Sequence, residues 1–347
     1  MKWWLLLLAL LPLAAATAIA GVVSSPSSAR PCLEEFTDGV NGGPTHLVLG
    51  PGGDLYATQE VEKTILRFDP ETHEAREYKV PVEPHDLTAG PDGWVWFLSA
   101  TGKPKKPPQY LGAVNPKNGV VKMFKGITKD SEPHMLRWNR GKLYITLQRA
   151  GQFAIFDPKT EKVTEGQFGL PILAAPHNLV VLPNGDMWAV LQEGDALARF
   201  SFAKQRFDKV VPIPEVQSGP RDITYVKSRN AIYATLFAAN KLVEYDLDTE
   251  KLTLHDVGVD PIAYDVAISR QPKAKLTFLR PDAEEEAIWI ATLAGGELLR
   301  FDLETNEVDN VGCGVEIPGG PLGIATDSQG RLWTVEPFPG RVALVKQ

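Results

Sequence analysis

The chain has 347 residues, of which 44% are hydrophobic and 23% charged, with 30 glycines and 28 prolines. This composition is that of a globular protein with a large core, and it excludes disordered and fibrous classes. The formal net charge is -7 and no basic run exceeds Lys103–Lys106, which excludes a nucleic-acid-binding protein. The chain has only two cysteines and no CxxC pair, which excludes zinc fingers and disulfide scaffolds.

The first twenty residues have the pattern of a signal peptide. Met1-Lys2 is a short positive start, Trp3 to Leu13 is almost unbroken apolar sequence, and Ala18-Ile19-Ala20 is a small-x-small cleavage pattern. The apolar run is shorter than the roughly 20 residues of a membrane span. We therefore expect an exported, secreted or secretory-pathway protein, with residues 21–31 as a flexible mature N-terminus and no membrane association after cleavage. An uncleaved anchor is the alternative.

A repeated unit begins with a proline before a short apolar strand. The openings are Gly43-Pro44, Glu83-Pro84, Glu132-Pro133, Ala175-Pro176, Gly219-Pro220, Asp260-Pro261 and Gly320-Pro321. Each continues through a turn, usually containing glycine, a second strand rich in Trp or Tyr, a third strand, and a turn into a fourth strand. The interval between the last two opening prolines, Pro261 and Pro321, is longer than the others, and we assign its extra length to a polar insertion, Gln271–Glu286. Four strands per unit of this length predict an all-β, seven-bladed β-propeller with four-stranded blades.

The two ends of the repeat array complement each other. The seventh unit stops after three strands, at Arg341–Val345, and an orphan strand, Cys32–Phe36, precedes the first unit. We expect this N-terminal strand to complete the last blade and close the ring, which makes residues 32–347 one domain. A disulfide between Cys32 and Cys313 would hold that strand in place, but outer strands of neighbouring blades splay apart, so the pairing stays open.

In a blade, the residue that opens the first strand and the residue that closes the second lie on one face, near the central channel. Three histidines follow an opening proline directly: His85, His134 and His177. Fourteen residues after each of them stand Ser99, Gln148 and Leu191. The matching closing residues of blades one and seven are Gln59 and Glu336, and Arg221 occupies the histidine position of blade five.

The other histidines are expected to lie elsewhere. His73 and His255 fall in outer hairpins and are expected to be solvated, whereas His46 is one residue out of register and should face the neighbouring blade. Imidazoles grouped with carboxylates and amides could hold a divalent cation, or one imidazole could act as a general base. Alternatively, Pro-His only starts a strand, with its ring bonded to loop carbonyls.

Two stretches carry a family resemblance. The segment Pro84–Gly93 with Trp96-Phe97, and Glu132-Pro133-His134 with Gln148, resemble the virginiamycin B lyase family. The resemblance implies a seven-bladed propeller that opens streptogramin B depsipeptides by elimination at an ester, using Mg²⁺. It also implies that His134 is the base and that His85, Glu132 and the closing residue hold the metal. This chain has Gln148 where the family has Glu, so one anionic ligand is missing.

We therefore expect an exported, lyase-like propeller that acts on a small molecule or a cyclic ester or depsipeptide, with His177, Gln59, Arg221 and Glu336 as further substrate contacts. A metal-independent enzyme of secondary metabolism, of the lactonase or hetero-Diels–Alderase type, is one alternative. A non-catalytic binding propeller is another, and the Lys103–Pro108 loop and the insertion Gln271–Glu286 could then contact a partner. We expect a monomer without a nucleic-acid partner.

Overall fold

The computed structural model describes residues 33–99, 110–172, 174–257, 276–292, 298–310, 321–338 and 340–346. The chain divides into residues 1–30 and 31–347, and everything described below belongs to the second unit. The expected signal peptide, the flexible N-terminus, the Lys103–Pro108 loop and both cysteines lie outside the described residues. Within the described ranges, no helix has the length and apolar character needed to cross a membrane.

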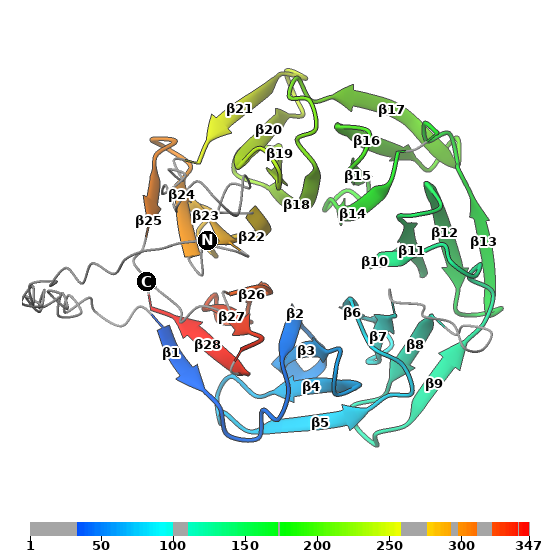
Figure 1. Ribbon diagram of the computed structural model, residues 1–347, viewed down its shortest axis with the longest axis vertical. Coiled ribbons are helices and arrows are strands. Elements are labelled where there is room, and N and C mark those ends of the chain that lie inside the picture. Colours follow the sequence, from blue (N-terminus) through cyan, green and yellow to red (C-terminus); the bar gives the residue numbers. More distant parts are fainter. Residues whose placement is uncertain are drawn as a thin grey trace, which may run out of the picture. The chain divides into compact units, whose positions relative to one another are not determined.

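Twenty-eight strands in the described residues form seven antiparallel four-stranded sheets around a ring, which confirms the seven-bladed β-propeller (Figure 1). The inner strands are β2 (Pro44–Leu49), β6 (Leu87–Ala89), β10 (Pro133–Asn139), β14 (Pro176–Val181), β18 (Pro220–Val226), β22 (Leu276–Pro281) and β26 (Ile324–Thr326). The second strands are β3 (Leu55–Gln59), β7 (Val95–Leu98), β11 (Lys142–Leu147), β15 (Met187–Leu191), β19 (Ala231–Leu236), β23 (Ala287–Thr292) and β27 (Leu332–Glu336).

The third and outer strands complete the blades, which we number one to seven from β2 onward. The third strands are β4 (Thr64–Phe68), β8 (Leu111–Val114), β12 (Gln152–Asp157), β16 (Ala196–Ser201), β20 (Lys241–Asp246), β24 (Leu298–Asp302) and β28 (Arg341–Val345). The outer strands are β5 (Ala75–Lys79), β9 (Val121–Phe124), β13 (Lys162–Gly166), β17 (Arg206–Pro212), β21 (Leu252–Asp256), β25 (Val308–Asn310) and β1 (Leu33–Phe36). A single 3-10 turn, η1 (Pro51–Gly53), is the one helical element of the described residues.

The predicted closure by the N-terminal strand is confirmed. β1 pairs antiparallel with β28, from Leu33 opposite Val345 to Phe36 opposite Val342. Phe36 also packs on Phe68 of blade one, with ring centroids 5.6 Å apart. The N-terminal strand therefore joins blade seven by its backbone and blade one by a side chain.

The core is a series of layers between neighbouring blades. In β3, Leu55 and Ala57 pack toward blade seven, whereas Tyr56 packs toward blade two. Each second strand is thus buried on both faces, which explains why these strands are mostly aromatic and aliphatic and lack polar alternation, with their threonines and other polar residues near the ends.

Blade six corrects the expected boundaries. Its inner strand β22 begins at Leu276, which pairs with Thr292 in the position that proline occupies in other blades. Asp260-Pro261, the expected opening, lies outside the described residues. Residues 276–286, assigned to a polar insertion, are instead the inner strand and its hairpin turn, so the assignment was wrong. The proline pattern failed here because leucine takes the place of proline.

Candidate functional site

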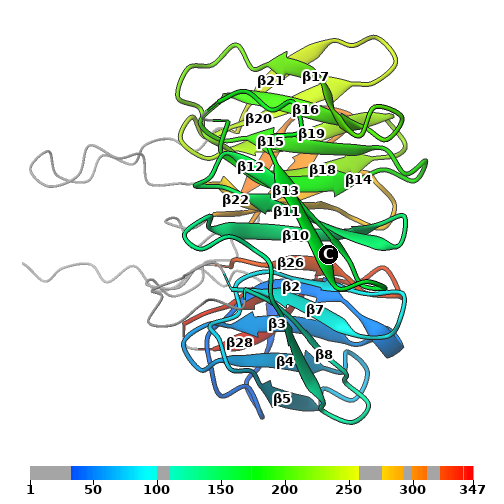
Figure 2. The same cartoon turned by 90° about the vertical axis from the view of Figure 1, so that its right-hand side faces the viewer.

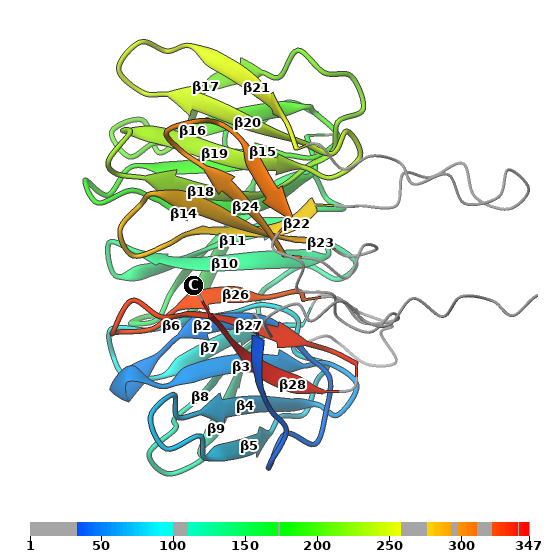
Figure 3. The ribbon, with the colours of Figure 1, turned by 90° about the vertical axis from the view of Figure 1, so that its left-hand side faces the viewer.

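Inner strands begin, and second strands end, on the same face of the ring, which we call the mouth face. The register pairs Pro44 with Gln59 and Pro176 with Leu191, so the opening and closing residues stand opposite each other. Figures 2 and 3 show from two sides how the blades stack around the ring. Side chains from consecutive inner strands can therefore meet at the mouth face.

Four histidines from four consecutive blades form a continuous histidine row. The ring centroids of His46 and His85 are 4.6 Å apart, those of His85 and His134 are 4.5 Å apart, and those of His134 and His177 are 3.9 Å apart. The Nε2 atoms of His85 and His134 lie 3.3 Å apart, so one ring can donate a hydrogen bond to the other. The structure thus brings the three predicted histidines together.

His46 extends the row beyond what the sequence indicates. Its ring contacts both His85 and, edge-on, Phe278 of blade six, with centroids 4.9 Å apart in the second contact. His46 faces the neighbouring blade two, as expected, and its second contact, with Phe278 of blade six, shows that its ring also reaches the centre of the propeller.

Threonines of the second strands hold the backbones of three of these histidines. Thr58 Oγ1 donates to the backbone carbonyl of His85 at 2.9 Å, and Thr146 Oγ1 donates to that of His177, also at 2.9 Å. Thr58 Oγ1 also accepts from the amide of His46 at 3.2 Å. One hydroxyl thus fixes histidine backbones of two adjacent blades.

Glu60 is the functional candidate that sequence reasoning missed. Its Oε1 accepts from His85 Nδ1 at 2.7 Å. In blade three, Pro133 pairs with Leu147, not with Gln148, so Gln148 stands one residue beyond the closing position, as Glu60 does in blade one. The spacing varies because the hairpins differ in length. Aligning the blades on their paired strands would have revealed Glu60.

His46, Glu60 and His85 form a possible metal-binding group. Each offers one ligand atom, and the three atoms lie within 4.8 Å of one another. His85 and Glu60 keep 17% and 29% of their side chains exposed, so an ion could reach them from the solvent. This donor set contains His85 from the predicted metal site, but its carboxylate comes from another blade.

The interior of the row favours neutral imidazoles. Burial, reinforced by the charges of neighbouring rings and of Arg221, lowers the pKa of His46 and His134 well below the ordinary value. The same causes lower the pKa of His177. The Nδ1 atoms of His134 and His177 are buried without a hydrogen-bond partner. These rings therefore have nitrogen atoms that no protein group uses.

The other predicted metal ligands have protein partners. Glu132 Oε2 forms an ion pair with Arg149 at 2.8 Å. Gln148 Nε2 donates to Gln192 Oε1, which stands at the equivalent position of blade four. The role of Glu132 and Gln148 in metal binding stays a prediction.

Two of the predicted substrate contacts are fully buried. Gln59 accepts from Thr64 Oγ1 at 2.6 Å, inside blade one. Glu336 is buried in blade seven, and neither of its carboxylate oxygens has a hydrogen-bond partner.

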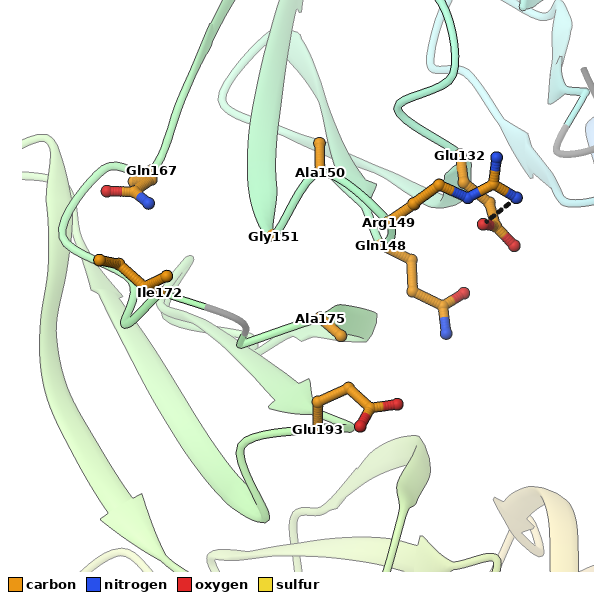
Figure 4. Close-up of a pocket in the computed structure, with 9 residues that line it drawn as sticks. All are labelled: Glu132, Gln148, Arg149, Ala150, Gly151, Gln167, Ile172, Ala175 and Glu193. Carbon is orange, nitrogen blue, oxygen red and sulfur yellow. Dashed lines mark ion pairs between the residues drawn. The ribbon is translucent and has the colours of Figure 1, made fainter.

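A pocket of about 320 Å³ lies on the mouth face between blades three and four (Figure 4). The Glu132–Arg149 ion pair and Gln148 lie on one side of it, and Ile172 and Glu193 are among the residues on its other sides. The residues directly before the two opening prolines, Glu132 and Ala175, both belong to its lining. The pocket therefore adjoins the His134 and His177 positions and offers room for part of a ligand.

A polar belt links the inner strands of five blades around the channel. It consists of Asp86, Arg137, Asn178, Asp222 and Arg280. Arg137 Nη1 donates to Asp86 Oδ2 at 2.8 Å, and Arg280 Nη1 donates to Asp222 Oδ2 at 3.0 Å. Asp86 and Asn178 directly follow His85 and His177 in the sequence, so these two belt residues fix the chain next to two of the histidines.

Blade seven has no side chain to offer to this belt at Gly323. A Cβ built there would come within 2.6 Å of the Leu47 amide nitrogen of blade one. The backbones of blades seven and one therefore approach too closely for any residue but glycine at this position.

The outer histidines differ from each other. His73 is exposed, as expected, although its ring also lies 4.1 Å from that of Phe36. His255 was expected to be solvated, which was wrong: its side chain is 11% exposed and its Nε2 lies 2.7 Å from Glu244 Oε2. His255 belongs to β21, and its ring is covered by Phe301 of blade six, with ring centroids 5.0 Å apart.

The fold and the mouth define the protein as a seven-bladed propeller with a histidine-lined centre, and solved structures share this fold. One is a streptogramin B lyase, with a TM-score of 0.74 and 16% identity over 90% of this chain and 96% of that chain. Another is a catalytically inactive virginiamycin B lyase from Staphylococcus aureus with quinupristin, with a TM-score of 0.74 and 17% identity over 91% and 99%.

Other propellers are also similar. Hydrazine synthase from Kuenenia stuttgartiensis has a TM-score of 0.69 and 13% identity, over 90% of this chain and 97% of that chain. No protein-family model and no curated protein matches the chain. At these identities the likeness shows the fold alone, so the resemblance predicted from the sequence is confirmed at the level of the fold.

Proposed function

We propose that the mouth face is the active site of a metal-assisted lyase that opens a small or cyclic ester. The observation that carries this proposal is the group of His46, Glu60 and His85, whose ligand atoms lie within 4.8 Å of one another, with His134 in contact with His85. The shared fold with lyases that act on streptogramin B compounds supports the choice of reaction.

The donor set indicates which cation would fit. Two imidazole nitrogens and one carboxylate oxygen suit Zn²⁺, Mn²⁺ or Fe²⁺, whereas Mg²⁺ prefers oxygen ligands. Such an ion would act as a Lewis acid on a carbonyl oxygen. The proposal therefore replaces the Mg²⁺ expected from the family resemblance with a softer divalent ion.

His134 would act as the base, because its buried ring has a nitrogen without a protein partner. It would accept the proton from the carbon next to the ester-bearing carbon, where a carbonyl makes that proton acidic. The electron pair of the broken C–H bond then forms a C=C bond, and the carboxylate of the ester leaves. The ring of His177, 3.9 Å away, would hold His134 in position.

A metal-independent reaction is the second candidate, and one hydrogen-bonded chain favours it. Glu60 Oε1 accepts from His85 Nδ1 at 2.7 Å, and His85 Nε2 lies 3.3 Å from His134 Nε2. In this chain a carboxylate orients one imidazole, and that imidazole contacts a second. Acid–base catalysis uses groups arranged in this order.

Thermal unfolding with Mn²⁺, Zn²⁺ and Mg²⁺ tests the metal site. We expect Mn²⁺ or Zn²⁺ to raise the midpoint of the wild type by preferential binding to the folded state, and Glu60→Gln to lose this effect. Glu132→Gln is the matched control, since Arg149 already occupies that carboxylate. Loss of the effect in Glu132→Gln alone would restore the metal site expected from the sequence. No rise with any ion would leave the metal-independent candidate.

The reaction is tested by incubating the same proteins with quinupristin and following its mass. Elimination opens the ring without a change in mass, whereas hydrolysis adds the mass of one water molecule. A product of unchanged mass that wild type forms and His134→Ala does not would support the lyase. An intact substrate, despite metal binding, would leave a non-catalytic propeller or another substrate class.

We also propose that the protein is exported and monomeric, on the strength of its N-terminal sequence pattern and its ring closure within one chain. Sequencing of the N-terminus of the purified protein tests the first point, because an intact Met1 would contradict cleavage after Ala20.

A further inference from the structure

Arg221 is a partly buried cation for which no acidic partner is found in the described residues. It follows the opening proline of blade five, in the position that His85, His134 and His177 occupy in their blades. The ion pairs of the described chain do not include it, although most other partly buried arginine side chains of the inner strands, such as Arg137 and Arg280, pair with aspartates. A partly buried cation without an acidic partner loses hydration and gains no ion pair in exchange, so its presence needs an explanation.

The charge of Arg221 acts on the centre of the mouth. The guanidinium lowers the pKa of His46, His134 and His177, which belong to three different blades. Burial in turn lowers the pKa of Arg221 itself. β18, which carries Arg221, packs beside β14, which carries His177, whereas Glu60 follows β3 of blade one. Arg221 therefore stands at the blade-four end of the histidine row and Glu60 at the blade-one end.

The orientation of Arg221 leaves its donors available. Its guanidinium carbon lies over the Phe237 ring, 4.7 Å from the ring centroid, so the aromatic face is one neighbour of the cation. Contact with an aromatic face leaves N–H groups of a guanidinium for other partners, and those groups match the two oxygens of a carboxylate.

We propose that Arg221 anchors a carboxylate group of the substrate at the mouth. This inference rests on the proposed function, because it assigns a ligand group to the same mouth. A carboxylate fits better than a phosphate dianion, because the single positive charge of Arg221 balances one carboxylate and would leave a dianion half neutralised. The substrate class is therefore an ester that also carries a carboxylate, bound with the carboxylate on blade five and the reacting bond near His134.

Binding of benzoate and of inorganic phosphate to the full chain, in the presence of a chelator, tests the proposal by ligand-observed NMR. We expect wild type to bind benzoate, and Arg221→Gln to bind it about tenfold more weakly or worse, because a charge-assisted bidentate contact is lost. Arg221→Lys should fall between them. The control is Arg76→Gln, since Arg76 also lies over an aromatic ring, Tyr78, at 5.0 Å, but on the outer strand β5.

Thermal stability separates a binding role from a structural one. Removal of a partly buried cation without an acidic partner should leave the midpoint of Arg221→Gln unchanged or higher, whereas loss of a structural arginine would lower it. Equal benzoate affinity in wild type and Arg221→Gln would overturn the proposal, as would a lowered midpoint with no binding in the wild type. Tighter binding of phosphate than of benzoate would overturn the assignment to a carboxylate.

The experiment also keeps this inference apart from the metal site. Because a chelator is present, a failure of metal binding cannot abolish the benzoate signal. Conversely, Arg221→Gln should keep the response to Mn²⁺ or Zn²⁺ that Glu60→Gln loses. Anion binding without metal binding would therefore retain Arg221 as an anchor while removing the metal-assisted reaction.

Discussion

Glu336 is a fully buried carboxyl group at the end of β27, beside the ring closure. The nearest cation, Arg341, lies 3.9 Å away and forms a closer ion pair, at 2.5 Å, with Glu35 of the N-terminal strand. Burial, together with the negative charge of Glu35, raises the pKa of Glu336 to about 7. Near neutral pH this one residue therefore changes its charge inside the folded protein.

Glu336→Gln should make the protein more stable in mild alkali. The pKa of Glu336 is higher in the folded state than in the unfolded state, so folding favours the protonated form and stability falls as the pH rises from about 4.5 to about 7. The substitution removes this fall and should raise the free energy of unfolding at pH 8 by at most about 3 kcal/mol.

Urea unfolding from pH 5 to pH 8 measures the effect of Glu336→Gln. Glu34→Gln is the control, because that carboxylate is about half exposed and faces Lys346 at 3.5 Å. Identical pH profiles for wild type and Glu336→Gln would show that the carboxyl does not titrate in this range.

At the scale of the strands, the polar belt holds neighbouring inner strands together. Asp222 accepts hydrogen bonds from the Leu279 amide and from Arg280, both at 3.0 Å, and its side chain is 1% exposed. Its other oxygen accepts from Asn178 of blade four. Asp222 therefore connects three consecutive blades through one carboxylate.

Asp222→Ala should lower the free energy of unfolding by about 2–4 kcal/mol, because it leaves a buried amide and a partly buried guanidinium without partners. Chemical denaturation measures the loss. Asp130→Ala should cost less than about 1 kcal/mol, since its ion pair with Lys129 is half exposed. A similar cost for both variants would mean that the belt contributes no more than a surface pair.

The repeat pattern predicts the strands well because its signals are local. Proline openings, glycine turns and aromatic second strands recur in nearly every blade, and the one opening without proline, at Leu276, is the one placed wrongly. Three histidines of the row are marked by Pro-His. His46 and Glu60 are not, because their position depends on strand register and hairpin length. Contacts between blades, such as Arg137 with Asn178, depend on strand spacing that no local pattern encodes.

At the scale of the whole ring, closure depends on one short strand. A chain that begins at residue 37 lacks β1, whereas a chain that begins at residue 31 keeps it. The shorter chain should have an unfolding midpoint about 10 °C lower, because it loses one strand pairing and the burial of Leu33 and Phe36. The same truncation exposes the edge of β28, so light scattering should show aggregation. Equal midpoints for the two chains would mean that the ring is held closed by side-chain packing alone.

The pairing of β1 with β28 also sets an order of events during synthesis. β1 leaves the ribosome first, yet its only backbone partner among the described strands is made last. Six blades can form from neighbouring segments while the chain grows, but the seventh must wait for a contact that spans nearly the whole sequence. Such long-range contacts form slowly, so the nascent protein passes through an open arc with two bare sheet edges. We expect the nascent protein to be most prone to misassembly before β28 has been made and has paired with β1.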